Sequence, residues 1–197
     1  MISQISKQKI EDMFLGACQS SEHPVIYATC GIPGAGKSTF VAYKLEQGDF
    51  PQNAFYFNPD KVMEALPEYQ TDCQTIGAQA AYQKWELPCR ELAYAMADRA
   101  AENKFNVIKD MGCANPLSLA YIQKLKQTGY RIEMHHIDCD INEAFYRIDQ
   151  REFRISREEV QKRYALLDEL LPLYREIADI FVTYDNTNVK DPYQIAA

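Results

Sequence analysis

The sequence predicts an α/β fold in which helices cover both faces of a parallel sheet. Five short apolar runs with the pattern of buried strands alternate along the chain with amphipathic helical patterns. The 197 residues suit one domain spanning residues 1–197. Strand–helix alternation of this kind calls for right-handed crossovers, and it places the carboxyl ends of the strands along one edge of the sheet.

Each expected element rests on a local signal. Asn58 and Asn115 each precede a proline, which is a favourable cap-plus-first-turn pair, and Ser156 with Glu159 forms a capping box. Residues 66–75 are polar and are expected to form a loop. The expected strands are residues 25–30, 54–58, 105–110, 130–138 and 180–186. The expected helices are residues 3–18, 37–46, 76–103 and 116–128, with further helices beginning at Pro59, after Asp140 and after Ser156.

A glycine-rich segment lies between the first expected strand and the helix that follows it. Residues 31–38 match GxxxxGK[ST] without a gap, and the strand–loop–helix context is the one that this motif requires. Backbone N–H groups of such a loop surround phosphate oxygens, while the lysine reaches the β- and γ-phosphates. The motif predicts a three-layer P-loop NTPase sandwich, and the expected nucleotide-binding residues in it are Gly31, Ile32, Pro33, Gly34, Ala35, Gly36, Lys37, Ser38 and Thr39.

Two aspartates follow expected strands. Asp110 ends the third strand and, with the Ser38 hydroxyl, is the candidate for holding Mg²⁺, although a simple strand-end turn is the alternative. Asp60 lies in the first turn of a helix just past the second strand, where an aspartate also favours the helix dipole. Since the strand ends share one edge, Asp60 is the candidate general base for an acceptor hydroxyl.

Arginines cluster in the segment 147–163. Arg147, Arg151 and Arg154 follow helical spacing and would share one face if the helix continued that far. A solvated face paired with nearby glutamates is one interpretation. The other is a helical lid, at about residues 141–165, whose guanidinium groups stabilise charge on the transferred phosphoryl group. Built-in arginines and a candidate base favour a kinase over a nucleotide switch.

Composition limits the other possibilities. The net charge of −7 argues against nucleic-acid binding over the whole surface, and no apolar run is long enough to span a membrane. The N-terminal segment lacks a signal-peptide pattern, so we expect a cytoplasmic place of action, or delivery into the cytosol of another cell. The six cysteines are scattered and are expected to be free thiols.

The segments GIPGAGKST, FNPDKVMEALPEYQ, REFRIS…EEVQKRY and YDNTN together resemble the zeta-toxin family of P-loop kinases, over roughly residues 25–188. The resemblance implies a kinase that uses ATP or GTP with Mg²⁺ and, for some members, phosphorylates UDP-N-acetylglucosamine at a sugar hydroxyl. It also implies an antitoxin-like protein partner. It matches Lys37 and Ser38 to the phosphate and magnesium pair, Asp60 to the base, and Arg154 with Arg147 or Arg151 to the lid arginines.

One segment departs from the family pattern. Sugar-nucleotide kinases of the family often have glutamate, threonine and arginine after the third strand, where this chain reads KDMGCANP. The resemblance also matches Asp185 and Asn186 to a terminal pair for which the sequence gives no role. The predicted function is transfer of the γ-phosphoryl group to a hydroxyl of a small metabolite. The alternatives are a 5′-hydroxyl polynucleotide kinase and a nucleotide-dependent switch or binding module.

Overall fold

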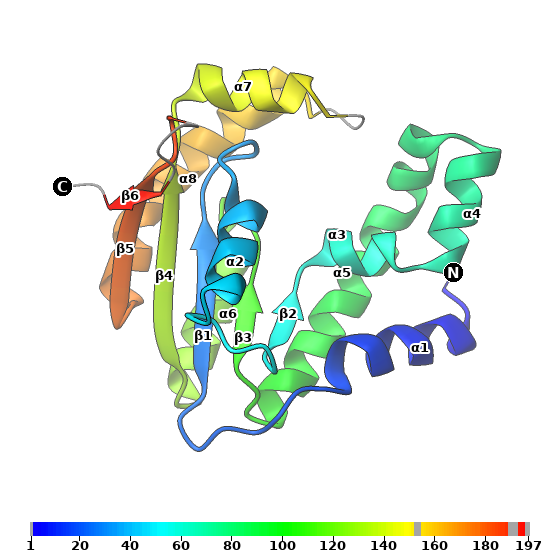
Figure 1. The fold of residues 1–197 in the computed structure, drawn as a ribbon, viewed down its shortest axis with the longest axis horizontal. Helices are drawn as coiled ribbons and strands as arrows, with labels where there is room; N and C mark the ends of the chain where they lie inside the picture. Colours follow the sequence, from blue (N-terminus) through cyan, green and yellow to red (C-terminus); the bar gives the residue numbers. More distant parts are fainter. Residues whose placement is uncertain (1, 152–154, 189–192, 196–197) are drawn as a thin grey trace. The chain divides into compact units, whose positions relative to one another are not determined.

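The computed structural model describes residues 2–151, 155–188 and 193–195 and divides the chain into two compact units. Unit 1 comprises Met1–Glu22 and Asn53–Val107, and unit 2 comprises His23–Gln52 and Ile108–Ala197. Figure 1 labels the helices and strands of both. In the part of the chain that the structure describes, none of the helices has an apolar stretch long enough to cross a bilayer.

The sheet of unit 2 carries the glycine-rich segment. Its strands follow the order β3-β1-β4-β5-β6, beginning with β3 (Val107–Lys109). β1 (Val25–Cys30) lies beside β4 (Arg131–Asp138), and β4 lies beside β5 (Ile180–Asp185). These pairs are parallel, and Cys30 lies opposite His136, which in turn lies opposite Thr183. The predicted five parallel strands, β1 to β5, are confirmed. A short strand that the sequence did not indicate, β6 (Gln194–Ile195), pairs antiparallel with β5.

Helices flank this sheet on both faces, and Figure 1 shows α2 in front of it, α6 and α8 behind, and α7 above the upper ends of the strands. The predicted caps are present: the side chains of Asn115, Asp140 and Ser156 accept backbone N–H groups at the starts of their helices. Each cap satisfies N–H groups that have no partner within the helix. The helices are α2 (Lys37–Glu46), α6 (Pro116–Gln127), α7 (Ile141–Asp149) and α8 (Arg157–Ile177).

Unit 1 is built around one long helix, α5 (Ala78–Glu102), whose apolar face is buried. β2 (Phe55–Phe57) precedes α3, and the Phe55 N–H donates to the Asn106 carbonyl, just before β3 (Val107–Lys109). Asn58 caps α3 by accepting the N–H groups of Asp60 and Lys61. The other helices of unit 1 are α1 (Gln4–Leu15), α3 (Pro59–Glu64) and α4 (Pro67–Thr75).

The predicted loop at residues 66–75 is wrong, because Pro67–Thr75 forms the helix α4. Pro67 occupies the first helical turn, where its missing N–H has no cost. None of the residues of α4 is buried. A helix without a buried face needs no periodic apolar residues, so its sequence lacks the pattern that would have predicted it. Polar contacts hold it instead: the Asp72 carboxylate accepts the indole N–H of Trp85 and pairs with Lys84.

Two adjacent histidines of β4 face opposite sides of the sheet. His135 is 6% exposed and lies among the rings of Phe40, Phe50 and Tyr184, at centroid distances of 5.4, 5.2 and 5.9 Å. Neither of its ring nitrogens has a hydrogen-bond partner among the described residues. Burial therefore lowers the pKa of His135 to about 4, and burial also lowers that of His136.

This burial predicts a stability that depends on pH. An unfolded histidine titrates near 6.5 and folded His135 near 4, so the unfolded chain takes up the proton first as pH falls. The stabilisation is present above about pH 6.5 and is lost toward pH 4. In His135→Phe, the fall in the free energy of unfolding between pH 7 and pH 4.5 should shrink by about 2 kcal/mol, as measured by urea denaturation. His23→Gln, at an exposed position, is the control, and an equal fall in wild type and His135→Phe would contradict the assignment.

Candidate phosphate site

The glycine-rich segment forms a tight loop between β1 and α2. Gly34 and Gly36 have φ angles of +86° and +95°, which L side chains rarely adopt. A Cβ atom on Gly34 would lie 2.5 Å from the Ala144 carbonyl oxygen of α7, and one on Gly36 would overlap the Asn186 amide. Glycine is therefore required both by the backbone conformation and by neighbouring atoms, as expected for a loop whose N–H groups converge on an anion.

Lys37 lies at the first turn of α2, and its Nζ donates to the Ile32 carbonyl across the loop at 2.8 Å. Burial lowers the pKa of the Lys37 ammonium, the Asp110 carboxylate opposes this shift, and the charge of Arg151 adds to it. Asp110 is only 5% exposed, directly after β3. Within unit 2, the charges of two predicted site residues, Asp110 and Arg151, therefore act on a third, Lys37.

Ser38 and Thr39 are exposed in the first turn of α2. A serine hydroxyl and a carboxylate such as that of the buried Asp110 are oxygen donors that suit Mg²⁺, which keeps several waters and needs few protein ligands. The described residues contain no group of three His, Cys, Asp or Glu side chains arranged to hold a metal ion. The assignment of Ser38 and Asp110 to Mg²⁺ stays a prediction.

Asp60 lies in unit 1, exposed in the first turn of α3. Its backbone N–H donates to the Asn58 side chain at 2.9 Å, as the cap signal predicted. Its carboxylate acts electrostatically on Tyr69 of α4, whose pKa rises to about 12, mainly because of burial. Since the glycine-rich loop belongs to unit 2, the pairing of Asp60 with the phosphate site stays a prediction.

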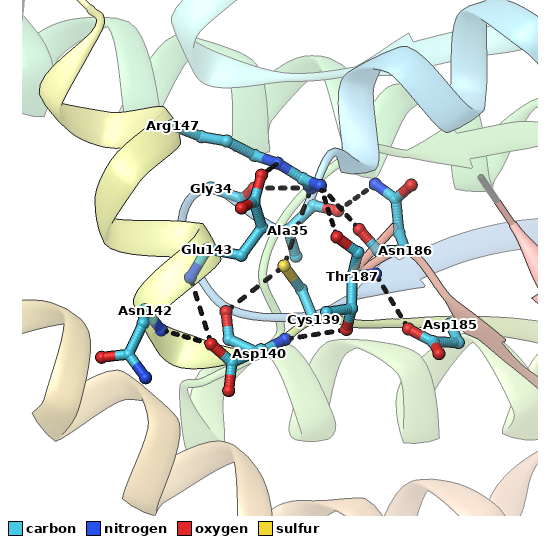
Figure 2. Close-up of polar contacts among 10 residues, drawn as sticks. All are labelled: Gly34, Ala35, Cys139, Asp140, Asn142, Glu143, Arg147, Asp185, Asn186 and Thr187. Atoms are coloured by element: carbon cyan, nitrogen blue, oxygen red, sulfur yellow. Dashed lines mark hydrogen bonds and ion pairs between the residues drawn. The ribbon is translucent and has the colours of Figure 1, made fainter. Parts of the chain in front are cut away.

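Two of the three predicted arginines lie among the described residues, and their environments differ. Arg154 lies outside the described residues. Arg151 is exposed just after α7, and its charge acts on Lys37. Arg147, on the last turn of α7, is part-buried: its Nε donates to Glu143 at 2.8 Å, and its terminal nitrogens donate to main-chain carbonyls, the shortest contact being to Asn186 at 2.7 Å (Figure 2). Its predicted contact with nucleotide phosphates stays a prediction.

Asn186 contacts the glycine-rich loop, a role that its position in the sequence did not indicate. It follows β5, is 5% exposed, and its side-chain amide donates to the Ala35 carbonyl at 2.7 Å. Its own N–H donates to the Asp138 carbonyl at 2.8 Å. No sequence signal indicated Tyr193, whose hydroxyl donates to the Gly36 carbonyl at 3.1 Å. Both residues are distant from the motif in sequence, and only the fold reveals these contacts.

The KDMGCANP segment offers few side chains to a ligand. Lys109 is fully buried and donates to Cys113 Sγ at 3.3 Å and to Ser118 Oγ at 3.2 Å. Cys113 is 3% exposed, and its carbonyl accepts the Tyr174 hydroxyl at 2.9 Å. The Gly112 carbonyl accepts the Gly31 N–H at 3.1 Å. This segment therefore supports the loop and the core of unit 2 through internal contacts.

A cavity of about 150 Å³ lies in unit 2 between the end of β4 and α8, with Ile32 in its wall. Its polar lining includes the carboxylates of Asp138 and Asp168 together with His136, and burial keeps the pKa of this histidine below its ordinary value. Carboxylates repel phosphate, whereas the glycine-rich loop contains the cationic Lys37. The lining of the cavity therefore does not favour a phosphate chain, and the loop stays the predicted phosphate site.

Comparison with known proteins points to one family. The family model described as Zeta toxin matches residues 11–196 of the chain. A comparison with curated proteins found no match.

Several solved structures share the fold. A structure of the PezAT chromosomal toxin–antitoxin system of the human pathogen Streptococcus pneumoniae has a TM-score of 0.71 at 15% identity, covering 99% of this chain and 82% of that one. The AvrRxo1-ORF1:-ORF2 structure with ATP gives 0.72 at 17% identity, and the match covers 98% of this chain but 66% of the other. A putative kinase from Chloroflexus aurantiacus gives 0.59 at 14% identity, with coverages of 86% and 92%. At these identities the structures show a shared fold.

The loop geometry predicts that Gly34→Ala impairs the phosphate site. The added Cβ is strained by the positive φ and collides with the backbone of α7, so affinity for ADP should fall at least about tenfold, as measured by calorimetry. Gly48→Ala is the matched control, because Gly48 has a φ of +77° but open space around it. That control should lose roughly 1 kcal/mol of stability and keep its ADP affinity. Equal ADP affinities in the two variants would contradict the assigned role of Gly34.

Proposed function

This chain belongs to the zeta-toxin family of P-loop phosphotransferases, and from that premise we propose that it transfers the γ-phosphoryl group of ATP to a hydroxyl group of a small metabolite. The observation that carries the proposal is the loop at residues 31–38, together with the Lys37, Asp110 and Arg151 charges gathered beside it. A nucleotide sugar such as UDP-N-acetylglucosamine is the acceptor that family membership favours. The similarity to a structure with ATP supports ATP as the donor.

Each residue at the site has a proposed task. The loop N–H groups bind the phosphate oxygens, and Lys37 leaves the Ile32 carbonyl to contact the β- and γ-phosphates. Ser38 and Asp110 would hold Mg²⁺, which would neutralise charge on the phosphates. Arg151 and Arg154 stabilise the charge that spreads over the transferred group. Transfer then needs no activating partner to supply an arginine.

The proton of the acceptor hydroxyl requires a base. Asp60 is the proposed base because it is an exposed carboxylate in a capped first turn directly after β2. The Asn58 cap fixes the start of α3 and with it the position from which this carboxylate projects. As the acceptor oxygen attacks the γ-phosphorus, the proton passes to Asp60 and the bond to the β-phosphate oxygen breaks.

We further propose a neutralising protein partner for this chain. The structures of the PezAT toxin–antitoxin system and of AvrRxo1-ORF1:-ORF2 support this proposal, because in each a protein of similar fold belongs to a system or complex with a second component. A cytosolic place of action, in the producing cell or in another cell, fits a kinase that draws on ATP.

A transfer assay with γ-labelled ATP tests the proposed reaction. The acceptor panel comprises UDP-sugars, nucleosides, dinucleotides and 5′-hydroxyl oligonucleotides. We expect the label on a small hydroxyl-bearing acceptor, and first on a UDP-sugar. Label on oligonucleotide ends would replace this proposal with the polynucleotide kinase alternative. A chain of the Pnkp1/Rnl/Hen1 RNA repair complex is similar in fold to this chain. Label found only in inorganic phosphate would indicate a switch.

Replacing the proposed base separates binding from transfer. Asp60→Asn keeps the shape of the side chain but cannot accept the proton, so transfer should slow by about 10²–10⁴-fold while ATP affinity stays at the wild-type value. Glu64→Gln, on the same helix and ion-paired with Lys61, is the matched control and should transfer normally. Wild-type transfer rates in Asp60→Asn would remove Asp60 from the mechanism.

A further inference from the structure

The carbonyl groups of the phosphate loop accept hydrogen bonds from side chains that lie far away in the sequence. The Ala35 carbonyl accepts the Asn186 amide at 2.7 Å, and the Gly36 carbonyl accepts the Tyr193 hydroxyl at 3.1 Å. The Gly34 carbonyl lies 3.5 Å from the Arg147 guanidinium. Figure 2 shows Arg147 reaching from α7 toward Gly34, Ala35 and Asn186.

Peptide geometry gives these contacts a function. Each peptide unit is planar and trans, so the carbonyl of one residue and the N–H of the next point in opposite directions. An N–H that points into the loop therefore requires that the carbonyl of the preceding residue points out of it. A carbonyl turned inward would repel phosphate oxygens, and an outward carbonyl that is buried without a donor is costly. Donors on the outer side of the loop therefore favour the one backbone arrangement that binds an anion.

Arg147 is committed to this outer side. Its Nε donates to Glu143. One terminal nitrogen lies 3.5 Å from the Gly34 carbonyl and 3.6 Å from Cys139 Sγ. The other donates to the Asn186 carbonyl at 2.7 Å and lies 3.4 Å from the Thr187 carbonyl. A guanidinium has five N–H groups, and these contacts involve all three of its nitrogens. The guanidinium thus contacts α7, the loop and the segment after β5. Because its shortest bond is to Asn186, which in turn donates to Ala35, Arg147 influences the loop largely through Asn186.

Asn186 is fixed from both directions. Its N–H donates to the Asp138 carbonyl at the end of β4, its carbonyl accepts Arg147, and its side-chain amide donates to Ala35. Gly36 approaches it so closely that a Cβ there would overlap the amide nitrogen. The position of Asn186 is set by the sheet, so the loop is held against a rigid element.

We propose that Arg147 and Asn186 are positioning residues of the nucleotide site, which keep the carbonyls of Gly34 and Ala35 turned away from the phosphate chain. Because the nitrogens of Arg147 are occupied by these contacts, Arg151 would be the first lid arginine. The inference deepens the proposed function and rests on its nucleotide-binding step. It does not depend on the identity of the acceptor.

Affinities for ADP and ATP, measured by calorimetry with Mg²⁺ on the full chain, distinguish positioning from direct contact. If Arg147 shapes the loop, Arg147→Ala should weaken ADP and ATP by the same factor, about tenfold. Asn186→Ala removes the bond to Ala35 but keeps the carbonyl that Arg147 contacts and every positive charge, and it should show the same parallel loss. Arg151→Ala should leave ADP affinity unchanged and lower ATP affinity or turnover.

A matched control isolates the loop contacts. Arg163→Ala removes an arginine with the same i, i+4 glutamate pair at 2.8 Å, and it should leave both affinities unchanged. Thermal unfolding of each variant verifies that it is folded at the assay temperature. If Arg147→Ala is not folded, the affinities of Asn186→Ala alone decide the test.

Two outcomes would overturn the inference. A loss in Arg147→Ala that is much larger for ATP than for ADP would show direct contact with the γ-phosphate. Unchanged ADP affinity in both Arg147→Ala and Asn186→Ala would show that their contacts do not shape the site. Failure of the wild-type chain to bind either nucleotide would instead refute the proposed function itself.

Discussion

The polarity of the peptide group is the constraint on which the phosphate site depends. A loop can present N–H groups to an anion only if its carbonyls are turned outward and supplied with donors. In this chain the donors come from α7, from the segment after β5 and from Tyr193, which are separated from the loop by more than a hundred residues of sequence. The parallel order of β1, β4 and β5 is what brings them to one edge.

The same edge gathers charge. Burial lowers the pKa of Lys37, yet the neighbouring carboxylate of Asp110 favours its charged form. Arg151 adds positive charge close by, which raises the free energy of the site until an anion neutralises it. This cost in the unliganded protein turns into affinity for a phosphate chain, and it is larger in a part-buried loop than it would be in open solvent.

Local signals explain which parts of the molecule were predictable. The strand β1, the helix α2, and the caps at Asn58, Asn115 and Ser156 follow from short-range patterns and occur where they were predicted. The helix α4 was missed because nothing on it is buried and only polar contacts such as that of Asp72 hold it. The role of Asn186 was equally invisible, since its partner Ala35 lies 151 positions away and only the sheet brings the two together. For Arg147, sequence spacing indicated an arginine face but not that main-chain carbonyls would occupy its donors.

Our central proposal is that backbone N–H groups within residues 34–39 bind the phosphate chain of a nucleotide. The most direct test is to record the backbone amide resonances of these residues in ¹H–¹⁵N spectra while Mg²⁺·ADP is added, with adenosine as the comparison. The account predicts large shifts for the loop amides with Mg²⁺·ADP and none with adenosine. Loop amides that do not respond to Mg²⁺·ADP, or that respond equally to adenosine, would contradict it.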